Sequence, residues 1–200
     1  MIVSHTNRFI FLKTPKTAGT SIQNALKSIC EYPDVVTYGH INQITGENAS
    51  PLSEFATMQE LPNQISYFSF GFTRNPWSLA LSRYMYQIKR GRLPDFYKPE
   101  KLYFKLWVIS HYAQDYITDK TETWLFEDGK QTVQFIGKYE NLQKDFRYIC
   151  NIIGCGMLEL EHYNKSQVYI KNYRDWYGDE SKLLICKMFE FEIDTFKYTF

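Results

Sequence analysis

The stretch FIFLKTPKTAGTSIQNAL, residues 9–26, carries the strongest structural signal in the chain. An apolar run ends at Leu12, and lysines, hydroxylated residues and one glycine follow before an amphipathic pattern begins. A short apolar run that stops at a turn signal predicts a buried strand over Phe9–Leu12. The apolar spacing after the glycine predicts a helix over Ser21–Ile29. The stretch therefore predicts a strand, a tight loop and a helix in immediate succession.

The loop between these two elements has the composition of an anion site. A strand that turns directly into a helix leaves unpaired N–H groups and a positive dipole end at the turn. Gly19 lets a ligand approach the backbone, and Lys16 adds a positive charge. The Walker pattern is absent because the lysine precedes the glycine. The loop predicts a phosphate or sulfate site, and the alternative is an ordinary turn whose hydroxyls cap the helix.

A second element, YFSFGFTRNPWSLALSRY, begins at Tyr67. It predicts a strand over Tyr67–Thr73 and a helix that runs to about Lys89, with Asn75 as its cap and Pro76 in its first turn. Ligands of parallel α/β sheets gather at the carboxyl ends of strands, so this junction and the first loop are expected to share one crevice.

Two polar residues of that junction are candidates for holding a phosphate. Arg74, at the end of the strand, offers a planar guanidinium fork, and Ser82, in the helix, offers a hydroxyl. The alternative is a surface arginine and a serine on a helix face.

The rest of the chain continues the alternation of strands and helices. This order predicts an α/β protein, one domain over residues 1–200, with a mostly parallel sheet flanked by helices. The further elements expected are a strand over Val35–Tyr38, helices near Leu52–Gln59 and over 99–118, a strand within TVQFIGKYENL followed by a helix capped at Asn141, and a last amphipathic helix over 179–196.

Composition narrows the class of protein. A net charge of +1 over 200 residues argues against a protein that binds bulk nucleic acid. No segment approaches the ~20 apolar residues of a membrane span, and no metal-ligand spacing is evident. The four scattered cysteines are expected to be buried free thiols of a reducing compartment. A soluble, cytoplasmic protein without a membrane anchor, of the bacterial type, is therefore expected, with its oligomeric state open.

Two motifs together resemble the sulfotransferases that use 3′-phosphoadenosine 5′-phosphosulfate (PAPS). Residues 16–21, KTAGTS, resemble the loop that binds the 5′ phosphosulfate, and Arg74 to Ser82 resemble the element that binds the 3′ phosphate. FIGKYENLQKDF and FEIDTFKYTF resemble later blocks of the carbohydrate branch, which includes the heparan sulfate 2-O-sulfotransferases. The resemblance implies a P-loop NTPase-like three-layer fold and no metal.

The resemblance also implies roles for individual residues. Lys16 would stabilise charge on the leaving phosphate, and His40, in YGHIN, would be the base that takes the proton of a saccharide or glycoconjugate hydroxyl. Without the resemblance, a structural histidine is the simpler interpretation. The remaining donor-binding residues implied are Lys13, Thr17, Ala18, Gly19, Thr20, Ser21, Arg74, Ser82, Lys165 and Ser166.

Several points separate this chain from its relatives and leave other functions open. Ala18 stands where many relatives have a second glycine, and Lys138 replaces a frequent arginine. The basic run KRGR, residues 89–92, suits an anionic glycan or is a solvated face. The alternatives are a nucleotide kinase of the same architecture, and a relative that binds the nucleotide without catalysis.

Overall fold

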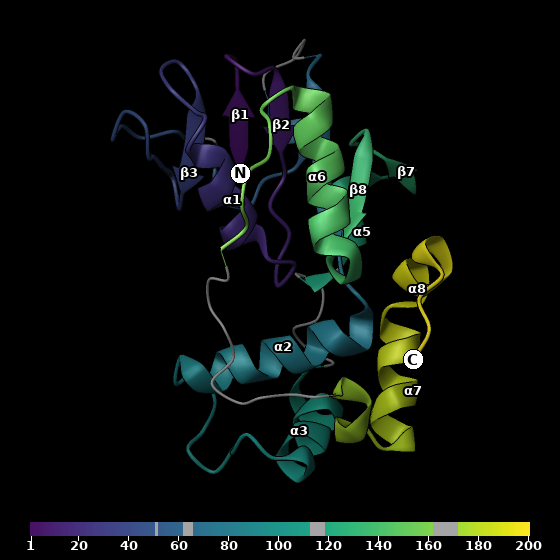
Figure 1. The fold of residues 1–200 in the computed structure, drawn as a ribbon. Helices are drawn as coiled ribbons and strands as arrows, with labels where there is room; N and C mark the ends of the chain where they lie inside the picture. The colour runs from purple at the N-terminus through teal and green to yellow at the C-terminus, as the bar shows by residue number, and fades with distance from the viewer. Residues whose placement is uncertain (51, 62–65, 113–118, 162–171) are drawn as a thin grey trace. The chain divides into compact units, whose positions relative to one another are not determined.

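The structure, a computed structural model, describes residues 1–50, 52–61, 66–112, 119–161 and 172–200 (Figure 1). The chain divides into two compact units. The first unit contains residues 1–73 and 121–163, and the second contains residues 74–120 and 164–200. The single-domain expectation stays a prediction.

A six-stranded mixed sheet forms the centre of the first unit, in the order β4-β3-β1-β2-β5-β8. β2, β5 and β8 run parallel, with Phe9 opposite Phe68 and Phe70 opposite Phe135, whereas β1, β3 and β4 pair antiparallel. The α/β class is confirmed, and the parallel arrangement holds for the β2-β5-β8 part. The strands are β1 (Ile2–Ser4), β2 (Phe9–Phe11), β3 (Val35–Tyr38), β4 (Ile41–Asn42), β5 (Phe68–Thr73) and β8 (Phe135–Lys138).

Alternation along β2 sends neighbouring side chains to opposite faces of the sheet. Phe9 and Phe11 pack with α1 (Gly19–Lys27) and α6 (Leu142–Ile153) on one face. Ile10 and Leu12 pack on the other face with α5 (Thr121–Leu125) and with Ala56 and Leu61. Both faces of the sheet are therefore covered, which the near-continuous apolar sequence of β2 requires.

The strand β1 was not predicted from the sequence. Val3 and Ser4 are nevertheless buried, and β1 pairs with both β2 and β3. The buried carboxylate of Asp34 fixes the turn that follows β1. It accepts hydrogen bonds from the Ser4 hydroxyl at 2.9 Å and from the N–H groups of His5 at 2.7 Å and Thr6 at 2.9 Å.

These hydrogen bonds govern the ionisation of Asp34. Burial alone would raise the pKa of this carboxyl, but the bonds from Thr6, Ser4, Glu31 and His5 outweigh it and lower the pKa below its ordinary 3.8. The ionised form of Asp34 therefore stabilises the fold.

The second unit begins with α2 (Pro76–Lys89), where the sequence prediction is confirmed. The Asn75 side chain accepts from the N–H groups of Trp77 at 3.2 Å and Ser78 at 3.3 Å, so it caps the helix. Its amide also donates to the Thr199 carbonyl at 3.0 Å. Aromatic residues dominate the core of this unit, among them Trp77, Tyr84, Phe104, Trp107 and Trp176.

Three expected helices differ from the prediction. Residues 99–118 give α3 (Lys101–Trp107) and a π-helical turn (Val108–Tyr112), and residues 113–118 lie outside the described part. The last helix breaks at Phe189 into α7 (Asp179–Met188) and α8 (Glu190–Phe196). The helix near Leu52–Gln59 is only a 3₁₀ turn (Met58–Glu60).

The start of α6 differs from the prediction in how it is capped. Asn141 stands at the N-cap of α6 but makes no side-chain capping bond, and Asp145 instead accepts from the Lys138 N–H at 2.7 Å. Further short elements are a β6–β7 hairpin (Phe126–Glu127, Lys130–Gln131) and 3₁₀ turns over Tyr139–Asn141 and Tyr173–Trp176. No helix in the described ranges is both long and apolar enough to cross a bilayer.

Candidate functional site

The loop between β2 and α1 has the backbone of an anion-binding turn. Lys16 and Ala18 both lie in the left-handed region, with φ of 59° and 65°. Left-handed residues in a turn direct successive N–H groups into one concavity, the arrangement that binds phosphates in many proteins. Ala18 is the N-cap of α1 and, being alanine, has no side-chain oxygen to cap the first turn. The N–H groups at this end of α1 therefore suit an anionic ligand.

Two threonine hydroxyls stabilise the loop internally. The Thr17 hydroxyl, which is buried, lies 2.8 Å from the Thr14 hydroxyl and donates to the Thr14 carbonyl at 3.0 Å. The Thr14 hydroxyl donates to the Phe72 carbonyl of β5 and so ties the loop to the sheet. The Thr17 side chain thus holds the shape of the loop. Thr20 and Ser21 follow in the first turn of α1.

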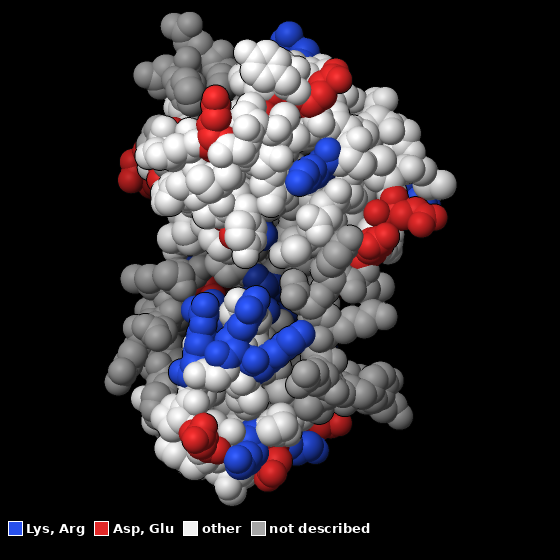
Figure 2. Space-filling view, turned by 90° about the vertical axis from the view of Figure 1, so that its left-hand side faces the viewer, with Lys and Arg blue, Asp and Glu red and all other residues white. Residues whose placement is uncertain are grey.

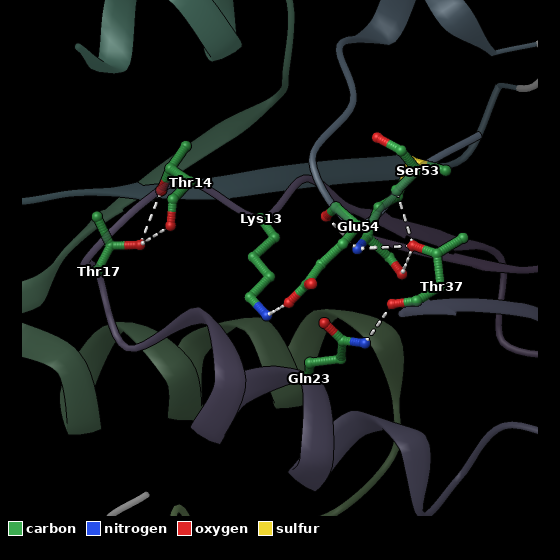
Figure 3. A network of polar contacts seen from close by, with 8 residues as sticks. Lys13, Thr14, Thr17, Gln23, Thr37, Ser53 and Glu54 are labelled. Carbon is green, nitrogen blue, oxygen red and sulfur yellow. Dashed lines mark hydrogen bonds and ion pairs between the residues drawn. The ribbon is translucent and has the colours of Figure 1, made fainter. Parts of the chain in front are cut away.

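Lys13 is buried at the start of the loop, and its ammonium group pairs with the Glu54 carboxylate (Figure 3). The ammonium also lies 5.6 Å from the centre of the Phe55 ring. The stem of Lys13 passes directly over Gly19, where an added Cβ would lie 2.6 Å from the Lys13 Cγ. Gly19 is therefore needed for side-chain room.

His40 lies in the turn between β3 and β4 and is exposed. Its Nδ1 lies 3.3 Å from the Leu52 carbonyl oxygen. A carbonyl can only accept a hydrogen bond, so Nδ1 is the protonated nitrogen in this contact. In the neutral ring the lone pair is then on Nε2, which makes Nε2 the atom able to accept a proton.

The segment Leu52–Glu54, which we call the strap, connects His40 to the loop. The Leu52 carbonyl contacts His40. The Ser53 carbonyl accepts from the Thr37 hydroxyl at 2.8 Å, and the Glu54 carboxylate pairs with Lys13 (Figure 3). Two residues of extended chain span at most about 7 Å. The strap therefore keeps the predicted base and a predicted donor-side lysine in one region of the first unit.

The candidate residues of the second unit lie along α2. The Arg74 guanidinium donates from Nε at 3.1 Å and from Nη2 at 2.9 Å to the Ser78 hydroxyl. Ser82 lies one helical turn beyond Ser78 and is half-buried like it. Ser78 was not predicted from the sequence, although it lies four residues from both Arg74 and Ser82, a spacing that places all three on one side of the helix.

A basic cluster, defined here as Lys89, Arg90 and Arg92, ends α2. Arg90 and Arg92 both stack on the Tyr86 ring, at 5.4 Å and 5.5 Å from its centre. All three cations are exposed, and Figure 2 shows Lys and Arg side chains gathered at the height of α2. The ring attracts both guanidinium groups, so the two like charges lie close to one another.

The remaining predictions concern Lys165 and Ser166, metals and the thiols. Lys165 and Ser166 lie outside the described residues. The described part of the chain holds no cluster of metal-ligating side chains. All four cysteines are free thiols, as predicted, but only Cys150 is fully buried.

Comparison with known proteins supports the resemblance to the sulfotransferases, whereas the carbohydrate branch stays a prediction. An uncharacterized protein of Archaeoglobus fulgidus is 38% identical over 88 residues, which cover 44% of this chain and 68% of that protein. The model of the sulfotransferase family matches residues 1–199, a span that contains the β2–α1 loop, His40 and α2. The chain therefore belongs to the sulfotransferase family.

Proposed function

We propose that this protein transfers a sulfuryl group from PAPS to an acceptor hydroxyl by in-line displacement. The main support for the proposal is the backbone conformation of the β2–α1 loop, found in a chain that belongs to the sulfotransferase family. Two left-handed residues there lead into a helix whose N-cap residue has no side-chain acceptor. Such a loop offers N–H donors and a lysine to a doubly charged group without needing a metal.

The first unit would bind the 5′ end of the donor. The N–H groups of residues 17–21, with the hydroxyls of Thr20 and Ser21, would hold the phosphosulfate, and Ala18 would serve through its backbone alone. Lys16 would stabilise the charge that grows on the oxygen between phosphorus and sulfur as the S–O bond breaks. Arg74 and Ser82 would hold the 3′ phosphate, with the Arg74 fork fixed in direction by Ser78.

His40 would activate the acceptor. Its Nε2 takes the proton of the acceptor hydroxyl as that oxygen forms its bond to sulfur. The bond from sulfur to the 5′ phosphate oxygen breaks, and 3′-phosphoadenosine 5′-phosphate (PAP) leaves. The Leu52 carbonyl supports this role because it stabilises the imidazolium through the Nδ1–H that it accepts.

The acceptor we propose is a saccharide or glycoconjugate. The stacked guanidinium groups of Arg90 and Arg92 suit carboxylate or sulfate groups on a sugar chain. The four free thiols support a reducing compartment such as the cytoplasm.

A thermal-shift titration tests the donor. A ligand that binds only the folded state at 100 times its Kd stabilises it by about 2.7 kcal/mol. We expect PAP without magnesium to raise Tm, with a smaller shift in Lys16→Met. Stabilisation by ATP with magnesium and none by PAP would overturn the proposal in favour of a kinase.

Transfer itself is tested with PAPS and a panel of sugar acceptors. His40→Ala should abolish transfer while PAP still raises Tm. His5→Ala is the matched control, since His5 is also exposed and its Nδ1 contacts the Tyr67 hydroxyl at 3.1 Å. Transfer by His40→Ala at the rate of the His5→Ala protein would remove His40 from the role of base.

A further inference from the structure

The Lys13–Glu54 ion pair of the first unit lies beside the β2–α1 loop and has a buried cation. Lys13 has 6% of its surface exposed, and its stem crosses Gly19, the first residue of α1. A buried ammonium group is costly unless a counter-charge and good geometry compensate it. Glu54 provides that counter-charge, so it also decides where the ammonium group lies.

The strap is held firmly enough to fix Glu54. The Ser53 carbonyl accepts a hydrogen bond from the Thr37 hydroxyl. The Thr37 carbonyl in turn accepts one from the side-chain amide of Gln23, in α1, at 2.8 Å. These bonds tie the strap, β3 and α1 to one another (Figure 3). Glu54 thus presents its carboxylate from a segment that is anchored to the helix beside which Lys13 lies.

We propose that Glu54 is a positioning residue that holds the Lys13 ammonium group for the sulfuryl group of the donor. The inference rests on the proposed function. An ammonium group has three donors, of which Glu54 needs one, so two remain for sulfuryl oxygens. Glu54 touches no reacting atom and acts only through Lys13.

The quantity that tests this role is the difference between the affinities for PAPS and for PAP. PAP lacks the sulfuryl group, so its affinity reports the rest of the site, whereas the ratio of the two affinities reports contacts to sulfur oxygens. The ratio can be measured by calorimetry without any acceptor. The experiment therefore does not depend on knowing the acceptor.

The test compares wild type with Glu54→Gln, Lys13→Met and the double variant. In Glu54→Gln we expect the preference for PAPS over PAP to fall about tenfold, while the Kd of PAP stays within about threefold of wild type. If Glu54 acts through Lys13, adding Glu54→Gln to Lys13→Met changes the preference no further. Glu60→Gln is the matched control: Glu60 is exposed and contacts Thr57, and its replacement should leave the preference unchanged.

Each other outcome overturns this inference. An unchanged preference in Glu54→Gln shows that the carboxylate does not position Lys13 for sulfur. If Glu54→Gln lowers the affinity for PAP as much as that for PAPS, and also lowers Tm, the Lys13–Glu54 pair is structural only. An additive effect in the double variant shows that Glu54 acts without Lys13. A wild-type protein that binds neither nucleotide overturns the proposed function instead, so the two failures are distinguishable.

Discussion

Replacing Gly19 by alanine tests the packing between α1 and Lys13. The new Cβ would lie 2.6 Å from the Lys13 Cγ and 3.1 Å from its Cε, so the whole side chain must leave its place. The displaced ammonium group then loses Glu54. Breaking a buried ion pair costs about 3–5 kcal/mol, and the 21% exposure of the Glu54 side chain favours the lower bound.

A second effect has the opposite sign. Alanine favours a helix over glycine by up to about 1 kcal/mol, so the net loss expected in Gly19→Ala is about 2 kcal/mol. Urea unfolding measures it: for an m-value of about 2 kcal/mol/M, the midpoint falls by about 1 M. The same substitution in a Lys13→Ala background, where the obstructing stem is gone, should cost nothing or stabilise slightly. An equal loss in both backgrounds would refute the steric reasoning.

Three further predictions concern ionisation and capping. The pKa of Asp34 lies below its ordinary 3.8, so ionised Asp34 stabilises the fold fully above that pH, and this stability is lost as the pH falls through the folded-state pKa. Asp34→Asn should cost about 2–3 kcal/mol of unfolding free energy at pH 7. It should also flatten the acid limb of a stability–pH curve, whereas an unchanged limb would contradict the assignment. Burial raises the pKa of the Cys30 and Cys155 thiols to about 12, helped by the Asp34 carboxylate at Cys30 and by the Cys150 thiol at Cys155. At pH 8 iodoacetamide should therefore label both far more slowly in the folded protein than in urea, and equal rates in a mass-spectrometric time course would disprove this. Asn75→Ala removes a cap and the hydrogen bond to the Thr199 carbonyl, and it should lower the unfolding free energy by about 1–3 kcal/mol. Asn75→Asp keeps the cap oxygen and should lose less; equal losses would show that capping is unimportant there.

Elements with local signals were predictable from the sequence. The start of α2 was correctly placed because an N-cap asparagine and a proline in the first turn act within three residues of one another. β3 was correctly placed because its apolar run is short and bounded by turn residues. The position of these elements needs no knowledge of the rest of the chain.

What depends on distant residues was not predictable. The segment Ile2–Ser4 becomes a strand only because β2 and β3 lie on either side of it. The Lys13–Glu54 pair joins residues 41 positions apart, and no periodicity connects them. For the same reason, the sequence predicts only that Gly19 lets a ligand approach, whereas the structure shows that the Lys13 stem also needs the space.

The mixed sheet has a consequence for the order in which the chain acquires structure. β1, β2 and β3 lie within the first 38 residues, and β1 pairs with both of the others. The other edge of β2 pairs with β5, which begins only at Phe68. Pairings between distant segments are the slow ones because a long loop must close first. On the ribosome, the newly made antiparallel part of the sheet therefore exposes an unpaired apolar strand edge until residues Phe68 to Thr73 emerge. In pulse-labelled hydrogen exchange, the amides of β1 should become protected before those of β8. This interval is where we expect a chaperone to be needed most.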